Sequence, residues 1–104
     1  MFNFATVIVA NQEALIQKEN VSSLRFSPID VLSHSEDRRI RTRNIERACT
    51  LGNAYHGKVL IHFVTVDGNA HRVDTTIWAS DDRYITLKAG ASLPVRAITG
   101  IEFM

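Results

Sequence analysis

Apolar and polar residues alternate through most of the C-terminal half of the chain, from Gly57 to Phe103. Successive side chains of a β-strand point to opposite faces, so this pattern predicts strands with one buried face. Turn-forming residues interrupt the alternation at 67–69, 80–82 and 89–91. Loops of about three residues at these points bring the apolar sets of successive strands onto one face, which predicts an antiparallel meander.

The register that follows pairs Phe63 with Val73 and Val59 with Ile77 in the first hairpin. A two-residue loop would instead place Arg72 opposite Phe63, on the apolar face. The same rule gives these pairs in the later hairpins: Ile77–Ile85, Thr75–Leu87, Leu87–Leu93 and Ile85–Val95. The expected core is Val59, Ile61, Phe63, Val73, Ile77, Ile85, Leu87, Leu93, Val95 and Ile98. Pro94 predicts that the strand containing it is short or lies at an edge.

The opposite face of this sheet is also rich in apolar residues. In the expected register, Lys58, Leu60, His62 and Val64 lie opposite Trp78, Thr76, Asp74 and Arg72 in that order, and Trp78 faces Tyr84. His62 and Asp74 then form a surface pair. Because an apolar face of this size is rarely left to solvent, a helix, the N-terminal segment or a second subunit should cover it. The candidate interaction face is Leu60, Val64, Trp78 and Tyr84.

A helix is expected over residues 36–53. Ser33 and Glu36 have the spacing of a capping box, and Gly52 with Asn53 suits a left-handed C-terminal end. Arg41 conflicts with this helix, because it falls on the same arc as the apolar residues. A start near Arg43 would avoid the conflict.

The residues before this helix give weaker signals. The β-branched run 7–9 favours a strand that adds to the sheet, and residues 11–18 include good helix formers. Ser27, Pro28 and Asp30 resemble the start of a short helical turn that runs through Leu32. The apolar run at 5–10 has no basic residue before it, which argues against a secretion signal.

Length and composition place the chain among single globular domains. Its 104 residues suffice for one modest core. The expected domain consists of an N-terminal segment (1–35), a helix (36–53) and a sheet (57–103). The expected fold class is mainly β with added helices (α+β): a bent antiparallel meander or small, partly open barrel, with one or two N-terminal helices packed on it. One cysteine fits a cytoplasmic setting, and no stretch is long enough to span a membrane.

Arginines spaced four apart provide the first candidate for chemistry. Arg39, Arg43 and Arg47 would form one stripe on a helix, with Lys58 nearby, and arginine is well suited to phosphate contacts. The same stripe could be an ordinary solvated face, balanced by neighbouring acidic residues. The net charge of +1 provides no global attraction to nucleic acid, so we favour the solvated face.

The other reactive residue types do not converge. The four histidines, His34, His56, His62 and His71, lack metal-ligand spacing, and Cys49 fits a small buried hydrophobe better than a nucleophile. Asp81 and Asp82 fall in a tight turn, where aspartate is favoured for local hydrogen bonds. We therefore expect no catalytic residue, metal or cofactor, and no enzyme.

From Glu46 to Phe103 the chain resembles a family of short uncharacterised bacterial proteins associated with the Bacteroidota. The matching stretches are Glu46-Arg47-Ala48, Leu51-Gly52-Asn53, Thr75-Thr76-Ile77-Trp78-Ala79, Leu87-Lys88-Ala89-Gly90 and Leu93-Pro94-Val95. They cover a little over half of the chain, and residues 1–35 depart from the family pattern. The family has no established activity, so this resemblance implies no catalytic residue.

A helix followed by bent strands and a short closing strand is also similar to Sm-like and SH3-like small barrels. Val66-Asp67-Gly68 and Thr99-Gly100 lie where such turns are expected. The Asp/Asn-rich loop and the Arg-Gly pair with which Sm proteins hold RNA bases are missing from this sequence. The leading expectation is thus a noncatalytic interaction module that self-associates through its apolar outer face, with a nucleic-acid-binding small barrel as the alternative.

Overall fold

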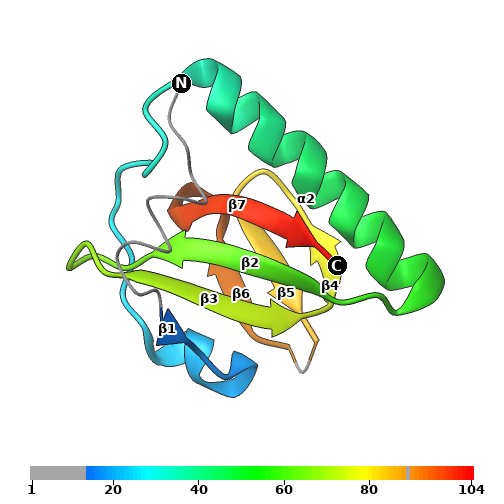
Figure 1. Cartoon of the computed structure of the whole chain (residues 1–104). Helices are drawn as coiled ribbons and strands as arrows, with labels where there is room; N and C mark the ends of the chain where they lie inside the picture. The colour runs from blue at the N-terminus through cyan, green and yellow to red at the C-terminus, as the bar shows by residue number, and fades with distance from the viewer. Residues whose placement is uncertain (1–13, 89) are drawn as a thin grey trace.

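Residues 14–88 and 90–104 of the chain are described by a computed structural model, and they form an α+β fold with one main helix (Figure 1). The elements are β1 (Ala14–Leu15), the 3₁₀ helix η1 (Lys18–Ser23), α2 (Ser35–Tyr55), β2 (Val59–Val64), β3 (Ala70–Thr75), β4 (Ile77–Ser80), β5 (Tyr84–Leu87), β6 (Ser92–Pro94), the 3₁₀ turn η2 (Val95–Ala97) and β7 (Ile98–Phe103).

The strands form two sheets rather than the single meander expected from the sequence. One sheet has the order β1-β3-β2-β7 and the other the order β4-β5-β6, and the sheets do not close into a barrel. All pairs are antiparallel except β1 with β3. The chain leaves the first sheet at Thr76, and its last strand returns to pair with β2. The predicted α+β class and antiparallel pairing are confirmed.

The register of the first hairpin differs from the expected one by two residues. Phe63 pairs with His71 and Val59 with Thr75, because the connection comprises residues 65–69 and is centred on Asp67, one residue before the centre of the expected loop at 67–69. Thr65 closes this longer loop: its N–H donates to the carbonyl of Asn69 at 3.1 Å, and its hydroxyl donates to Asp67 Oδ1 at 2.5 Å. A shift of two residues leaves every side chain on its expected face.

The second sheet also departs from the expected register, by two residues at Ile77 and by three residues at Ser80, which pairs with Ile85. Ile77 pairs with Leu87, and Ile85 pairs with Leu93. The pairing of β4 with β5 is irregular between Ile77 and Ala79, so Trp78 has no partner of its own across the ladder. β6 is three residues long and lies at a sheet edge, which confirms what Pro94 predicted.

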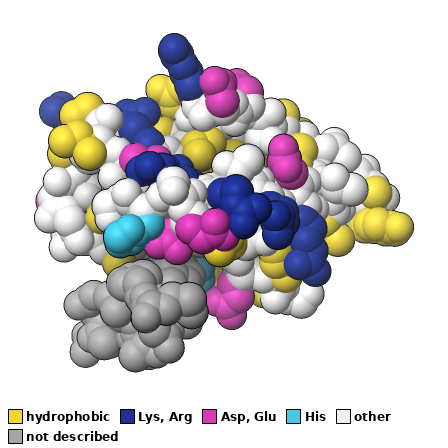
Figure 2. All heavy atoms as spheres, turned by 90° about the horizontal axis from the view of Figure 1, so that it is seen from above, with side chains coloured by type: hydrophobic (Ala, Val, Ile, Leu, Met, Phe, Trp, Pro, Cys, Tyr) yellow, Lys and Arg dark blue, Asp and Glu magenta, His cyan; other side chains and the backbone are white. Residues whose placement is uncertain are grey.

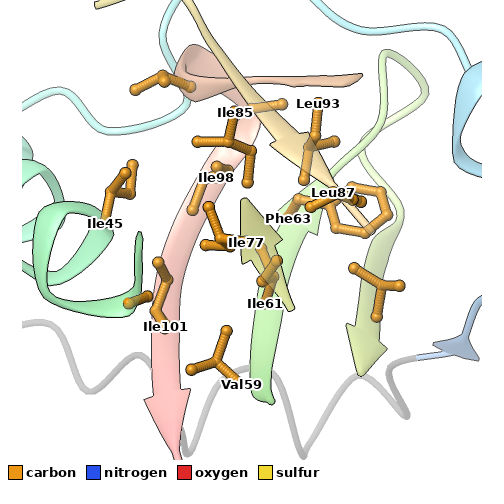
Figure 3. Close-up of a cluster of buried hydrophobic side chains, with 14 of the residues drawn as sticks. Ile45, Val59, Ile61, Phe63, Ile77, Ile85, Leu87, Leu93, Ile98 and Ile101 are labelled. Carbon is orange, nitrogen blue, oxygen red and sulfur yellow. The ribbon is translucent and has the colours of Figure 1, made fainter. Parts of the chain in front are cut away.

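The core lies between the two sheets, and all ten predicted core residues are buried. Figure 3 shows Ile61 and Phe63 of β2 gathered with Ile77, Ile85 and Leu87 of the other sheet. The core also contains residues that the sheet pattern did not include: Val21, Ile45, Ala48, Ala97 and Ile101. The alternation of apolar and polar residues therefore predicts which strand residues are buried, although it does not predict how the strands pair.

Helix α2 closes one open side of the sandwich by packing against the edge strands β4 and β7. The helix runs through Gly52 and ends at Tyr55, where His56 adopts a left-handed conformation (φ 55°), so the predicted stop at Gly52 and Asn53 is wrong. Gly52 is instead a packing residue, since an added Cβ would lie 2.2 Å from the carbonyl oxygen of Ile77. No side-chain cap forms at the N-terminus of α2, so the predicted capping box is also wrong.

Segments before α2 close the opposite side. η1 contacts β3 and β6, and its Val21 is fully buried. The ring of Phe26 lies 6.1 Å from that of Phe63. The short helical turn expected over 27–32 is wrong because these residues form a loop, and of the good helix formers at 11–18, Ala14–Leu15 forms a strand and Lys18 begins η1. The expected strand at 7–9 lies outside the described residues.

Candidate functional site

The four residues of the candidate interaction face do not share one face. Leu60 and Val64 lie on β2 and are partly buried, whereas Trp78 and Tyr84 lie in the other sheet. The prediction of one common face is wrong because it required the strand containing Trp78 to pair with β2, and β4 pairs with β5 instead.

His62 illustrates the consequence of the shifted register. It lies opposite Arg72, and its Nε2 atom is 3.1 Å from Oε1 of Glu102. Asp74 lies opposite Leu60, so the predicted pair of His62 with Asp74 is wrong. The side chain of His62 is only 7% exposed and is thus part of the folded structure rather than a free surface group.

Two aromatic side chains mark the solvent side of the second sheet. Tyr84 is adjacent to the inward-pointing Ile85, so it faces outward, and it is 44% exposed. Trp78 is 46% exposed, and its carbonyl accepts a hydrogen bond from Asn53 Nδ2 at 3.0 Å. Trp78 and Tyr84 are therefore available on a sheet that contacts α2 at β4.

A groove of about 630 Å³ lies beside Tyr84, between η1 and the strands β5 and β6. Its walls include Lys18, Phe26, Tyr84, Ser92, Pro94 and Arg96. Lys18 Nζ lies 3.4 Å from the carboxylate of Glu19. Arg96 donates from Nε to the carbonyl of Ser27 at 2.6 Å, and its own carbonyl accepts from the N–H of Val31 at 2.9 Å. The groove thus combines apolar walls with a fixed guanidinium group.

A smaller concavity of about 340 Å³ adjoins this groove, and Tyr84 and Arg96 border both. Its floor includes an ion pair in which Arg41 Nη2 lies 2.6 Å from Asp30 Oδ2. Arg41 Nη1 also donates to Asp30 Oδ1 and to the carbonyl of Ile98, both at 2.9 Å. The position that conflicted with the predicted helix is therefore a buried arginine that joins α2, β7 and the loop before α2.

The predicted arginine stripe is present on α2, but two of its three arginines already contact other side chains. Arg39, Arg43 and Arg47 are all exposed on α2, as is Lys58 after it. Arg39 Nη2 lies 2.6 Å from Glu36, and the guanidinium of Arg47 lies 4.3 Å from the centre of the Phe103 ring. Figure 2, which looks onto the side of α2, shows basic side chains with acidic ones among them.

The remaining reactive residues stay apart. Within residues 14–88 and 90–104, no three His, Cys, Asp or Glu side chains come together in a way that could hold a metal ion. Cys49 is a partly buried free thiol. The carboxylate of Asp81 accepts from the N–H groups of Tyr84 and Arg83, which holds the pKa of Asp81 below its usual value and matches the predicted turn role.

Sequence reasoning did not identify the groove, because its walls come from distant segments. Lys18 and Phe26 precede α2, whereas Arg96 follows the whole second sheet. The one available signal was Arg96 itself, a charged residue inside the apolar run from Leu93 to Ile98.

No helix in the described part of the chain has the length and apolar content needed to cross a membrane. Comparisons with known protein families, with curated protein sequences and with solved structures find no match to this chain. The resemblances to a bacterial family and to small barrels therefore stay predictions.

Proposed function

We propose that this protein is a noncatalytic interaction module that self-associates through the outer face of the β4-β5-β6 sheet. The observation that supports this proposal best is the exposure of Trp78 on β4 and of Tyr84 on β5, two strands that pair in this sheet. α2 packs against the edge of this sheet at β4, and the two aromatic side chains remain almost half exposed. Aromatic residues exposed together on a sheet are typical of protein contact surfaces.

The expected strength of this association follows from the area available. Each aromatic side chain has about 100 Å² left to bury, given the usual size of such residues. Burial of two copies of each in a two-fold dimer would contribute about 10 kcal/mol. Association itself costs about 4–15 kcal/mol in lost freedom of motion. We therefore expect a weak dimer whose population depends on protein concentration and hardly on salt.

Sedimentation velocity over a range of protein concentrations tests this proposal. We expect the wild-type chain to shift from monomer to dimer as its concentration rises, and Trp78→Ser to remain a monomer. Tyr55→Ser is the matched control, because Tyr55 is 77% exposed but lies at the end of α2. Equal dimerisation of the wild-type and Trp78→Ser proteins, or a wild-type monomer at every concentration, would refute the proposal.

The alternative function is nucleic-acid binding through Arg39, Arg43 and Arg47. Exposure of all three on one helix supports it, but the contacts of Arg39 and Arg47 described above reduce the charge available for phosphate. If the stripe binds RNA or DNA, affinity should fall steeply with salt, and replacing all three arginines with glutamine should abolish a gel shift. A shift that survives this replacement would exclude the stripe as the binding surface.

A further inference from the structure

The side chain of Arg96 is fixed by a hydrogen bond through Nε, and the N–H groups of its two terminal nitrogens can still donate to a ligand. Its Nε bond to Ser27 fixes the plane of the guanidinium at the border of the groove. Within the described residues, the side chain of Arg96 forms its hydrogen bond to Ser27 through Nε. Its two terminal nitrogens make no hydrogen bond or ion pair with these residues. An arginine oriented in this way has lost much of its rotational freedom before any ligand arrives, which lowers the entropic cost of binding.

The acidic groups nearest to Arg96 are Glu19 in the groove and Asp30 and Asp82 in the adjoining concavity. Asp30 accepts two hydrogen bonds from Arg41, and Glu19 is paired with Lys18. The charged residues that line the groove are Lys18, Glu19 and Arg96, which together carry a charge of about +1. Among the residues that line the groove, Arg96 therefore carries the charge that no carboxylate pairs with, and in the adjoining concavity the formal charges of Asp82 and Arg83 offset each other.

The rest of the groove is suited to an apolar group. Phe26, Tyr84, Ala91 and Pro94 line it, and Tyr84 presents an exposed ring beside Arg96. A volume of about 630 Å³ lies within the range of small-molecule sites. The groove therefore places an aromatic wall and a fixed cation within one small concavity.

We propose that this groove binds a small organic monocarboxylate with an apolar or aromatic body. The planar guanidinium of Arg96 would donate from its two terminal nitrogens to the two carboxylate oxygens, a geometry that arginine favours. The body of the ligand would lie against Tyr84, Phe26 and Pro94. A monoanion fits better than a phosphate group, because the groove has one uncompensated positive charge rather than two.

This inference is separate from self-association, although Tyr84 belongs to both surfaces. Trp78 does not line the groove, so the dimer interface can be disrupted by Trp78→Ser while the groove is kept intact. Ligand binding in that variant shows whether the groove functions without dimerisation. Loss of one property with retention of the other would tell the two proposals apart.

Titration of 3-phenylpropionate into the ¹⁵N-labelled full chain, followed by NMR, tests the inference. We expect saturable shifts of the Arg96 Nε–H and of the Tyr84 amide. The corresponding amide, 3-phenylpropionamide, should bind at least tenfold more weakly, because it lacks the charge that Arg96 recognises. Equal binding of acid and amide, or shifts confined to other surfaces, would overturn the proposal.

Two variants separate recognition by Arg96 from a general effect of charge. Arg96→Gln should weaken binding at least tenfold, whereas Arg83→Gln, which removes the same charge from the adjoining concavity, should leave it unchanged. Arg96→Lys keeps the charge without the planar fork and should give intermediate affinity, which covers the case in which glutamine disturbs the fold. Equal losses in the Arg83 and Arg96 variants would overturn the proposal.

Further ligands test the class of occupant. Phenyl phosphate should bind more weakly than the carboxylate, since a second free cation is lacking. An acetylated dipeptide with a free C-terminal carboxylate should gain nothing over the small acid. A preference of tenfold or more for the phosphate or for the peptide would reject the small monocarboxylate as the occupant.

Discussion

Replacing Gly52 with alanine is expected to lower the free energy of unfolding by about 2–3 kcal/mol, although alanine is the better helix former. The added Cβ would lie 2.2 Å from the carbonyl oxygen of Ile77 and 2.9 Å from Cγ2 of Thr76. The first neighbour is backbone within β4 and cannot rotate away, so α2 must move from the sheet edge that it covers. Urea unfolding monitored by circular dichroism measures the change.

Gly57→Ala is the comparison for this variant. Its Cβ would also make a close contact, at 2.6 Å, but with the side-chain atom Cγ of Leu51, which is partly buried. Because a flexible side chain can adjust, we expect Gly57→Ala to cost clearly less than Gly52→Ala. A Gly52→Ala protein that is as stable as the wild type would show that α2 does not pack tightly on β4.

Replacing Arg41 with methionine is expected to cost about 2–4 kcal/mol, slightly less than the usual penalty for breaking a buried ion pair because Asp30 is partly exposed. The side chain of Arg41 is 4% exposed and that of Asp30 25%. Without the guanidinium, Asp30 loses two hydrogen bonds and the carbonyl of Ile98 loses its donor. The loss should therefore be felt in α2, in β7 and in the loop before α2.

Arg39→Met provides the matched control. Arg39 lies on the same helix and also approaches a carboxylate at 2.6 Å, but both partners are exposed. Solvent screens such pairs, so the stability should hardly change. If Arg39→Met and Arg41→Met had equal effects on the free energy of unfolding, burial of Arg41 would not be the cause.

Acid should remove the difference in the free energy of unfolding between the wild-type and Arg41→Met proteins. Burial alone would raise the pKa of Asp30, but hydrogen bonds from Arg41 and from the N–H of Leu32 outweigh it and lower the pKa below its ordinary value of 3.8. A lowered pKa stabilises the folded state above the pKa of the unfolded chain, and this contribution is lost as the pH falls through the folded-state pKa. Urea unfolding at several pH values should show that the two free energies of unfolding become more similar below about pH 4.

The sequence predicted the faces of the strands better than their partners. Phe63 was expected opposite Val73 and lies opposite His71, yet it is fully buried as expected. A register shift of two residues preserves the inward and outward positions, whereas a shift of one would have exposed the core. The loop at 65–69 is closed by hydrogen bonds of Thr65, Asp67 and Asn69, which residue spacing alone did not reveal.

For the helix, the element was predicted correctly but the roles of two of its residues were not. Its existence was predicted, but Arg41 and Gly52 were misread as obstacles to it. Both residues are explained by partners far away in the sequence: Asp30 and Ile98 for Arg41, and Ile77 for Gly52. The candidate interaction face was affected in the same way, since Trp78 and Tyr84 were predicted to share an outer face with Leu60 and Val64, which belong to the other sheet.

The amino-acid pattern by itself determined the antiparallel strands, the ten core residues expected from strand alternation and the edge position of the strand that contains Pro94. These properties depend on local alternation and on residue type, so they can be read along the chain. Only the tertiary structure decided that the strands divide into two sheets, that α2 and η1 close the sides between them, and that Arg96 meets Phe26 and Tyr84 in one groove. The physical reason is that these features depend on contacts between distant segments, where the energy of a pairing is set by loop length and packing rather than by local pattern.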